Sequence, residues 1–293
     1  MSQQSFSYHV CGLKISSEFD LGLNQTQFSE PDVTFSQVDK LPKLTKKKAL
    51  GINSPIADIL IVEAKNVLLV IKPNVSLDDI RLEIIHTVIN ELLILRNVAC
   101  LHGCVLTKNG ITVAFIAPSG KGKSTLAAIL VEKNWALVSD DLLLLKIINN
   151  KIVAIPSFPT IRLWEESLNT LGLSYKSKKP IANRQGKYSV DAKGAYVEAS
   201  AQYELTHLYQ FDRSCHINEL KLNNIDKKEQ FWALLENTFD SEAQNIQADA
   251  HRFNLFSQLL SQVTCRKVLF PDNYQLLTAS ANGLIEDMDL QIP

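Results

Sequence analysis

The sequence predicts an α/β fold with a mixed sheet built around a glycine-containing loop, preceded by a small β-rich region. An almost wholly apolar strand over Ile111–Ala117 leads into that loop, and a helix over Lys123–Lys133 follows it. A second apolar strand, Ala136–Ser139, comes next. Strand, loop, helix and strand in this order form a βαβ unit, so we expect the sheet to be partly parallel.

The composition excludes several classes of protein. The 293 residues include 30 Lys and Arg against 31 Asp and Glu, and the chain has no basic block, which argues against a general nucleic-acid binder and against a membrane-surface protein. No apolar run approaches the roughly 18 residues of a transmembrane helix. Five scattered cysteines favour a reducing compartment, and the polar N-terminal residues show no secretory signal. A cytoplasmic protein is therefore expected.

Residues 1–75 are predicted to form a small β-rich N-terminal domain. Two β-branched runs, Ala57–Val62 and Val67–Ile71, flank the sequence Glu63-Ala64-Lys65-Asn66, which is typical of a hairpin. Strand-like alternation also occurs over Ser7–Ile15 and Asp32–Phe35, whereas the lysine-rich stretch Lys40–Leu50 is interpreted as a solvated loop.

Residues 76–293 are predicted to form the main domain. Ser76 and Asp79 are spaced as in a capping box, so a helix is expected from there through Leu95. Asn149-Asn150 predicts a tight hairpin turn between two apolar strands. The polar segment 171–190 is interpreted as a mobile loop. The remaining expected elements are a strand within Val197–Phe211 and helices over Lys227–Phe239 and Gln244–Ser261.

The strongest functional signal is the segment Ala117–Thr125, which matches the P-loop pattern with alanine in place of the first glycine. Gly120 and Gly122 allow backbone N–H groups to converge on phosphate oxygens. Lys123 supplies a cation toward the terminal phosphates, and Ser124 supplies a hydroxyl for Mg²⁺. ATP and Mg²⁺ are the expected cofactors, and a glycine-rich turn without a ligand is the alternative. The candidate binding residues are Ser119, Gly120, Lys121, Gly122, Lys123, Ser124 and Thr125.

An acid pair, Asp140-Asp141, follows the strand after the P-loop helix. Ligands of open α/β sheets bind at the carboxyl ends of the strands. Two adjacent acids can divide two tasks there, since one can bind the metal while the other accepts a proton from an attacking hydroxyl. A turn-capping aspartate is the structural alternative for either residue alone.

Three further residues are candidates with an open structural alternative. His102 could contact a phosphate or orient the acid pair, or it could be a buried structural histidine. Arg162 could neutralise a phosphate in transfer, or it could form a surface ion pair. Lys187 lies in the polar loop and could reach the nucleotide.

Together these segments resemble the core of the HPr kinase family, which shares its fold with phosphoenolpyruvate carboxykinase. The short gap between the P-loop and the acid pair is characteristic of that family. Some similar HPr-kinase-like proteins are encoded beside lasso-peptide biosynthesis genes and phosphorylate a precursor peptide on serine. The segments that carry the resemblance are Leu101–Gly103, Ser119–Leu126, Val138–Asp141, Pro156–Trp164, Tyr8–Leu21 and Pro31–Thr34.

The resemblance implies an ATP-dependent kinase that phosphorylates a serine or threonine hydroxyl of a peptide or small protein. It implies that Asp140 is the general base, that Asp141 and Ser124 lie nearer the metal, and that His102 belongs to the site. Family members often form homo-oligomers. No Glu-x-Arg-Gly-type signature follows the central loop, so neither HPr as the substrate nor the reverse phosphorylase reaction follows from the resemblance.

Two other functions stay open on the sequence. One is a P-loop kinase or NTPase that acts on a small-molecule hydroxyl. The other is a nucleotide-sensing module without transfer activity, although the intact Lys123, Ser124 and Asp140-Asp141 count against it.

Overall fold

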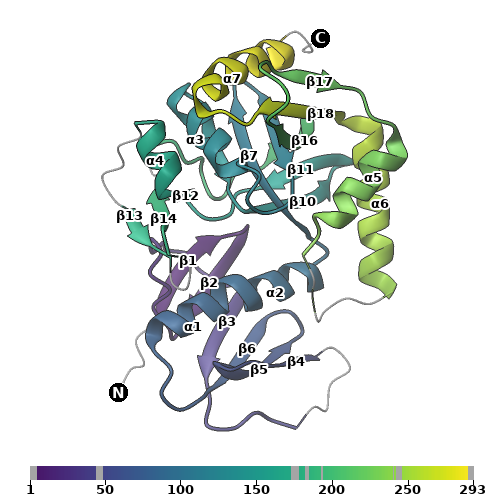
Figure 1. Cartoon of the computed structure of the whole chain (residues 1–293). Helices are drawn as coiled ribbons and strands as arrows, with labels where there is room; N and C mark the ends of the chain where they lie inside the picture. The colour runs from purple at the N-terminus through teal and green to yellow at the C-terminus, as the bar shows by residue number, and fades with distance from the viewer. Residues whose placement is uncertain are drawn as a thin grey trace. The chain divides into compact units, whose positions relative to one another are not determined.

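The computed structural model describes residues 5–43, 49–172, 178–181, 185–192, 194–239, 241 and 246–289 (Figure 1). The described residues divide into two compact units. One unit contains residues of the ranges 1–98 and 240–252, and the other contains residues of the ranges 99–239 and 253–293. Both contain mixed sheets, which confirms the predicted mixed α/β class. Within the described residues, no helix has the length and apolar character needed to cross a bilayer.

The first unit contains a six-stranded mixed sheet. Its two inner pairs, β2–β3 and β3–β6, are parallel, and the other pairs are antiparallel. The hairpin of β5 and β6 is confirmed, and Glu63 and Ala64 form its turn with positive φ angles. In spatial order the strands are β1 (Phe6–Val10), β2 (Leu13–Ser17), β3 (Val33–Gln37), β6 (Asn66–Ile71), β5 (Ala57–Val62) and β4 (Ala49–Asn53).

A helical segment follows this sheet, and its predicted start is confirmed. The Ser76 hydroxyl accepts a hydrogen bond from the Asp79 N–H at 3.2 Å, and the Asp79 carboxylate accepts one from the Ser76 N–H at 3.2 Å. The segment consists of α1 (Leu77–Glu83), a π-helical turn (Ile84–Val88) and α2 (Ile89–Leu95). It belongs to the first compact unit, which extends to Val98. That residues 1–75 form a domain by themselves stays a prediction.

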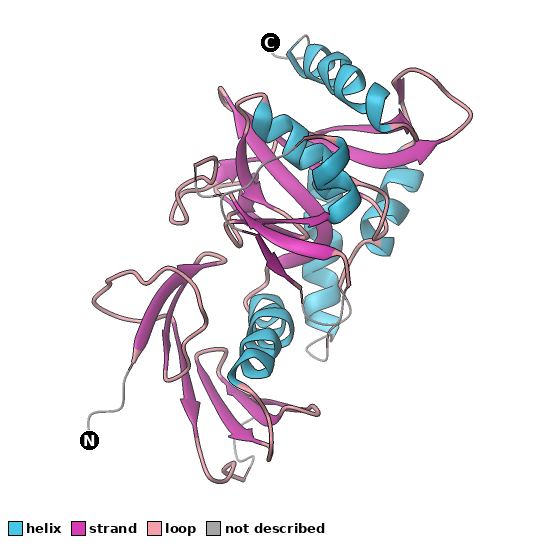
Figure 2. Cartoon of the chain, turned by 60° about the vertical axis from the view of Figure 1, so that its left-hand side comes forward, coloured by secondary structure: helices cyan, strands magenta, loops and turns pink. Residues whose placement is uncertain are grey.

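The second unit is built on a nine-stranded sheet (Figure 2). Three neighbouring strands, β8, β16 and β18, are parallel, and the other pairs are antiparallel. In spatial order the strands are β15 (Tyr203–Glu204), β11 (Lys151–Ile155), β10 (Leu142–Ile148), β7 (Ala99–Lys108), β8 (Ile111–Ile116), β16 (His207–Ser214), β18 (Thr264–Pro271) and β17 (Lys221–Asn223), while β9 (Ala136–Ser139) pairs with β7.

The expected crossover from β8 to β9 through helix α3 (Lys123–Glu132) is present, but the two strands are not neighbours. Strand β7 lies between them and is antiparallel to both. The sequence analysis did not predict β7, which contains His102 and Gly103. The sheet is nevertheless partly parallel, as expected, because β16 and β18 continue it on the other side of β8.

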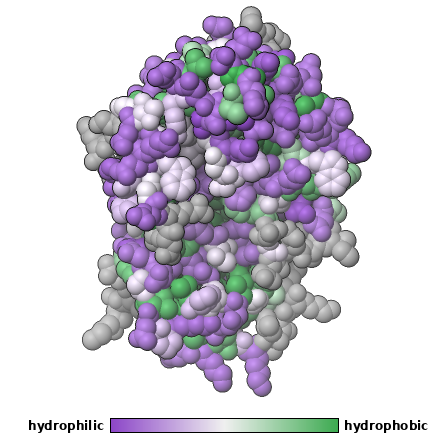
Figure 3. Space-filling model, in the orientation of Figure 1, coloured by the Kyte–Doolittle hydropathy of each residue, from purple (hydrophilic) through white to green (hydrophobic). Residues whose placement is uncertain are grey.

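Helices cover both faces of this sheet. Helices α3 and α7 (Tyr274–Asp289) pack on one face against Val113 and Phe115 of β8. Helices α5 (Lys227–Glu236) and α6 (Ile246–Gln262) pack on the other face against Ala114 and Ile116. Because successive strand residues point to opposite faces, β8 is buried along its whole length. The surface shown in Figure 3 is mostly hydrophilic, with apolar residues scattered over it.

The prediction that segment 171–190 is a loop is wrong at residues 178–180 and 187–190, whereas the other residues that the structure describes there lie in turns or irregular structure. Strands β13 (Lys178–Pro180) and β14 (Lys187–Asp191) join β12 (Thr160–Trp164) in a small antiparallel sheet. Val190 of β14 is fully buried against Ile161 and Leu163 of β12. The many charged residues around this short apolar pattern concealed the strand.

Gly103 allows β7 to pack closely against its neighbours. A Cβ atom at this position would lie 2.9 Å from the Phe115 carbonyl oxygen and 3.0 Å from the Leu143 Cβ. Backbone and Cβ atoms cannot rotate out of the way as the end of a flexible side chain can. A side chain at this position would therefore push the strands apart.

We expect Gly103→Ala to lower the free energy of unfolding by about 1–3 kcal/mol, because it overpacks a buried strand. Urea denaturation followed by circular dichroism measures the change. Gly194→Ala is the matched control, since a Cβ at Gly194 meets nothing within 4 Å. Equal stability of the two variants would contradict this account of Gly103.

Candidate functional site

The loop 117–122 leaves β8 at its carboxyl end and leads directly into α3. Gly122 caps the helix with φ +101°, and Gly120 has φ +86°, both in the left-handed region that favours glycine. A Cβ at Gly122 would also lie 3.3 Å from Arg213 Cδ. The two glycines therefore permit a loop that approaches its neighbours closely and precedes the first N–H groups of α3. Such a helix start is suited to binding an anion.

Lys123 is the first residue of α3, and its side chain folds back onto this loop. Its ammonium donates hydrogen bonds to the carbonyl oxygens of Ala117 at 2.6 Å and Pro118 at 3.1 Å, and the residue is buried. Burial lowers the pKa of Lys123, although Cys104 and the acid pair oppose this effect. The cation is therefore held against the loop backbone, where it could neutralise phosphate oxygens.

The acid pair occupies a break in a strand. Ser139, the last residue of β9, pairs with Val105 of β7, and Leu142, the first residue of β10, pairs with His102 of β7. Asp140 and Asp141 lie between these pairs, and Asp141 has φ +69°. In a regular strand, adjacent side chains would point to opposite faces. The left-handed residue breaks this alternation, and both carboxylates contact Arg162 of β12.

Asp140 connects the acid pair to the loop. Its Oδ1 accepts a hydrogen bond from Ser124 Oγ at 2.8 Å, and its Oδ2 accepts one from the Arg162 N–H at 2.9 Å. Burial raises the pKa of Asp140 to about 6, and the charge of Asp141 acts in the same direction. The two hydrogen bonds favour the charged form but do not cancel the effect of burial. Asp140 is thus a buried carboxyl group whose pKa lies close to neutral pH.

Asp141 has the opposite electrostatic environment. Its Oδ2 lies 2.6 Å from Nη1 of Arg162. Burial tends to raise the pKa of Asp141, but Arg162 first, and then Lys187, His102 and Lys123, outweigh burial and lower it. Asp141 is therefore the stronger acid of the pair. Environments that push the pKa values of two neighbouring acids apart are typical of sites where the acids have different roles.

His102 and Lys187 both lie near this pair, since the charge of each lowers the pKa of Asp141. The His102 ring contacts the Phe239 ring, with 3.7 Å between centroids, and its backbone N–H donates to the Asn237 carbonyl at 2.6 Å. Lys187 begins β14, is buried, and has its ammonium 5.7 Å from the centre of the Trp164 ring. The structure thus brings His102, Lys187 and Arg162 together around Asp141.

The other predicted binding residues differ in placement. The Thr125 hydroxyl lies 3.1 Å from Ser167 Oγ inside the protein, so its side chain is engaged away from the acid pair. Lys121 forms an ion pair with Asp212 of β16 at 3.0 Å. Ser119 is exposed. Ser124 therefore contacts the acid pair directly, whereas Lys123 interacts with it through its charge.

The sequence analysis missed Asp212 and Arg213, which lie near the end of β16 beside the loop. Arg213 approaches Gly122, its Nη2 lies 2.8 Å from Asp272, and its guanidinium lies 5.3 Å from the centre of the Tyr274 ring. The available signal was a pair of charged residues directly after an apolar strand. The predicted strand ended at Phe211, so the pair was not assigned to the edge of the sheet where ligands bind.

The donor set at the acid pair fits Mg²⁺. Mg²⁺ prefers oxygen ligands, usually one or two carboxylates with phosphate oxygens and waters. The Ser124 hydroxyl and the two carboxylates of Asp140 and Asp141 provide such oxygens. These three residues could hold Mg²⁺ together with a phosphate chain.

The raised pKa of Asp140 predicts how the apo protein responds to Asp140→Asn. The folded carboxyl group has a pKa of about 6, above the value of 3.8 for an unfolded chain, so its stabilising contribution is present below pH 3.8 and is lost as the pH rises through 6. At pH 8 the variant should be more stable than the wild type by roughly 2–3 kcal/mol, and at pH 4 the difference should nearly vanish. Urea denaturation in EDTA at both pH values measures this.

Asp141→Asn is the matched control and should change stability in the other direction. Burial raises the pKa of Asp141, but Arg162 and its cationic neighbours lower it overall. Its ionised form therefore stabilises the fold above pH 3.8, and this contribution is lost as the pH falls through the lowered pKa. The variant should be less stable than the wild type at pH 8. If both variants changed the free energy of unfolding in the same direction at pH 8, the two aspartates would not lie in opposite electrostatic environments.

No protein-family model matches the chain, and no curated protein matches it. Among solved structures, the HPr(Ser) kinase/phosphatase from Coxiella burnetii aligns with 66% of this chain and 99% of that chain. The sequence identity is 14% and the TM-score is 0.34. A likeness of this size does not establish a family for the chain.

Proposed function

We propose that the protein is an ATP-dependent kinase that transfers the γ-phosphate to a serine or threonine hydroxyl of a peptide or small protein. The contact of 2.8 Å between Ser124 Oγ and the Asp140 carboxylate carries this proposal, because it joins the phosphate-loop motif to a buried acid. The resemblance of the sequence to HPr-kinase-like proteins supports the choice of acceptor. Free thiols at all five cysteines support a reducing location such as the cytoplasm.

In this mechanism Asp140 accepts the proton of the acceptor hydroxyl. A bond forms between the acceptor oxygen and the γ-phosphorus, the bond from that phosphorus to the β,γ-bridging oxygen breaks, and ADP leaves. A general base works best when its pKa lies near the operating pH, and the burial that raises the pKa of Asp140 to about 6 suits this task. The hydrogen bond from the Arg162 N–H keeps the carboxylate oriented.

Charge stabilisation comes from the cations of the site. Ser124 and Asp141 would hold Mg²⁺, which would supply positive charge beside the terminal phosphates when bound. Lys123 contributes a fixed positive charge within the loop. Arg162 remains paired with Asp141 at 2.6 Å and so positions the acid pair. His102 and Lys187 add positive charge near Asp141, since the charge of each lowers its pKa.

Phosphorylation of a serine- and threonine-containing peptide library tests the proposal. With Mg-ATP we expect phosphopeptides detectable by mass spectrometry, and we expect Asp140→Asn to lower kcat by about 10²–10⁴-fold, the usual contribution of a general base. Asp141→Asn is the control, and its main effect should be a higher Mg²⁺ concentration at half-maximal rate. Phosphate transfer by Asp140→Asn at the wild-type rate would refute the base assignment.

The raised pKa of Asp140 also predicts a pH profile. Only the unprotonated carboxylate can accept a proton, so kcat should rise with pH through the pKa of Asp140 and then level off. The charge of bound Mg²⁺ should place this pKa below the value of about 6 that the metal-free site gives. Asp140→Asn should lose this inflection. Initial rates between pH 5 and 8 at saturating Mg-ATP measure it. ATP hydrolysis without any phosphopeptide would instead indicate an NTPase, and ATP binding without any turnover would indicate a sensor.

A further inference from the structure

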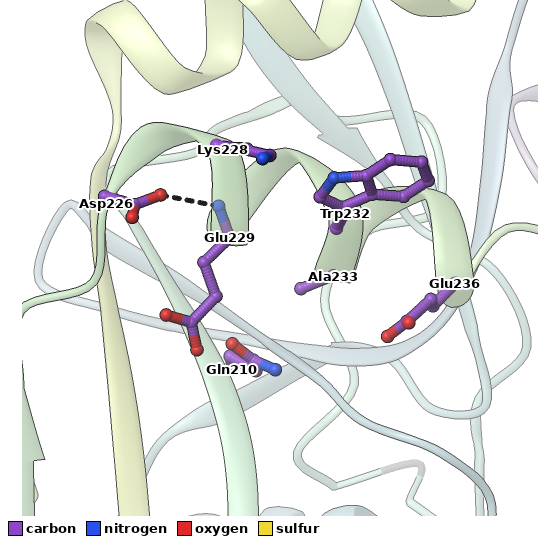
Figure 4. A pocket seen from close by; sticks show the side chains of 7 residues that line it. All are labelled: Gln210, Asp226, Lys228, Glu229, Trp232, Ala233 and Glu236. Carbon is purple, nitrogen blue, oxygen red and sulfur yellow. Dashed lines mark hydrogen bonds between the residues drawn. The ribbon is translucent and has the colours of Figure 1, made fainter.

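A cavity of about 400 Å³ lies between β16 and helix α5 (Figure 4). Gln210 of β16 lines one side, and α5 lines the other with Trp232 and charged residues. This volume falls within the range of about 300–1,000 Å³ that small-molecule sites take. None of the functional residues described above lines it.

The cavity begins close to the phosphate loop. Gln210 pairs with Ile116, the last residue of β8 before that loop. Asp212 follows two residues later on the same face of β16, and it forms an ion pair with Lys121 at 3.0 Å. The distance along the strand between Gln210 and this loop contact is thus about 7 Å. An elongated ligand could reach both places.

The cavity and the acid pair lie on opposite sides of the loop. From β9, which leads to the acid pair, the sheet continues through β7 and β8 to β16, which carries Gln210. Three strand spacings correspond to about 14 Å within the plane of the sheet. The cavity lies on the α5 face and Ser124 on the α3 face, so a bound nucleoside triphosphate would pass over the carboxyl edge of the sheet. Terminal phosphates at Ser124 and Asp140 would therefore leave the nucleoside end on the side of β16.

The lining suits a nucleoside better than a phosphate. Trp232 is 56% exposed although it is a large aromatic residue, so one face of its ring is available for stacking. Asp226, Glu229 and Glu236 outnumber Lys228, and although Glu229 pairs with Lys267 at 3.5 Å, the lining keeps a net negative charge that repels phosphate. Among the described residues, Gln210 Oε1 has no hydrogen-bond partner and almost no accessible surface, so a ligand meets it only when the side chain turns toward the cavity. A buried carbonyl oxygen of this kind is costly until a donor meets it.

We propose that this cavity is the nucleoside subsite of the triphosphate that the loop binds. The base stacks on Trp232, its amino group donates to Gln210 Oε1, and the phosphates extend over Lys121 toward Lys123. The acidic lining fixes the direction of the ligand, because it excludes the phosphate end. This inference rests on the proposed nucleotide-dependent function and adds the residues that recognise the base.

Titration calorimetry with two ligands separates the subsite from the phosphate loop. Inorganic tripolyphosphate presents the phosphate chain alone, whereas ATP presents the chain and the nucleoside, both at the same Mg²⁺ concentration. Stacking of one base contributes enough for a loss of about 5–100-fold on alanine substitution. We therefore expect Trp232→Ala to weaken ATP binding by that factor and to leave tripolyphosphate binding unchanged. Trp232→Phe should restore most of the ATP affinity.

Two further variants complete the design. Gln210→Leu should weaken ATP binding but not tripolyphosphate binding, because it removes the acceptor for the base. Phe253→Ala is the matched control, since Phe253 is another exposed aromatic residue, 62% accessible, that does not line the cavity. Circular dichroism checks that each variant is folded. Trp232 lies at the surface, so its substitution should leave the fold intact.

The outcomes distinguish the two proposals. If wild type binds both ligands and Trp232→Ala binds ATP with unchanged affinity, the subsite is overturned while the proposed function stands. If wild type binds neither ligand, both proposals fail. If Trp232→Ala lost the same affinity for ATP and for tripolyphosphate, the subsite would also be overturned. The substitution would then have weakened binding of the phosphate chain, not of the nucleoside.

Discussion

The hydrogen bond between the Ser124 hydroxyl and the buried Asp140 carboxylate is the interaction on which the candidate site depends. It connects the start of α3 to the break between β9 and β10, and Arg162 extends the connection to β12. A carboxyl group buried this deeply is costly in its charged form, so its pKa rises to about 6. The fold thus keeps a carboxylate that lowers its stability when ionised, at the position where the proposed reaction needs a proton acceptor.

Local sequence signals predicted the parts of the fold that local geometry determines. The turns at Glu63-Ala64 and Asn149-Asn150 take positive φ angles, as tight hairpins require, and Gly122 starts α3 in the left-handed region. Strand β7 was missed although the Asn109-Gly110 turn that joins it to β8 is a local hairpin signal, because His102 and Gly103 interrupt an otherwise apolar pattern. The position of β9 could not be predicted either, because strand order depends on which edges remain free.

The candidate site shows the same difference between features that local sequence determines and features that strand pairing determines. The loop and the acid pair are short contiguous motifs, and the sequence was sufficient to name Lys123, Ser124, Asp140 and Asp141. Gln210, Asp212 and Arg213 belong to no motif and lie near the loop only because β16 pairs with β8. Trp232 belongs to no motif either and lies on α5. Residues that approach a site from a distant strand are recognisable only after the sheet has been assembled.

The separation of these contacts along the chain has a consequence for the order in which the molecule folds. Ser124 and Asp140 are 16 residues apart, and Asp140 and Arg162 are 22 apart, so the acid-pair contacts close short loops. Thr112 and Thr206, which join the starts of β8 and β16, are 94 residues apart. Longer loops cost more entropy to close and slow the pairing. A nascent chain should therefore form the contacts around Asp140 before β16, which carries Gln210, pairs with β8.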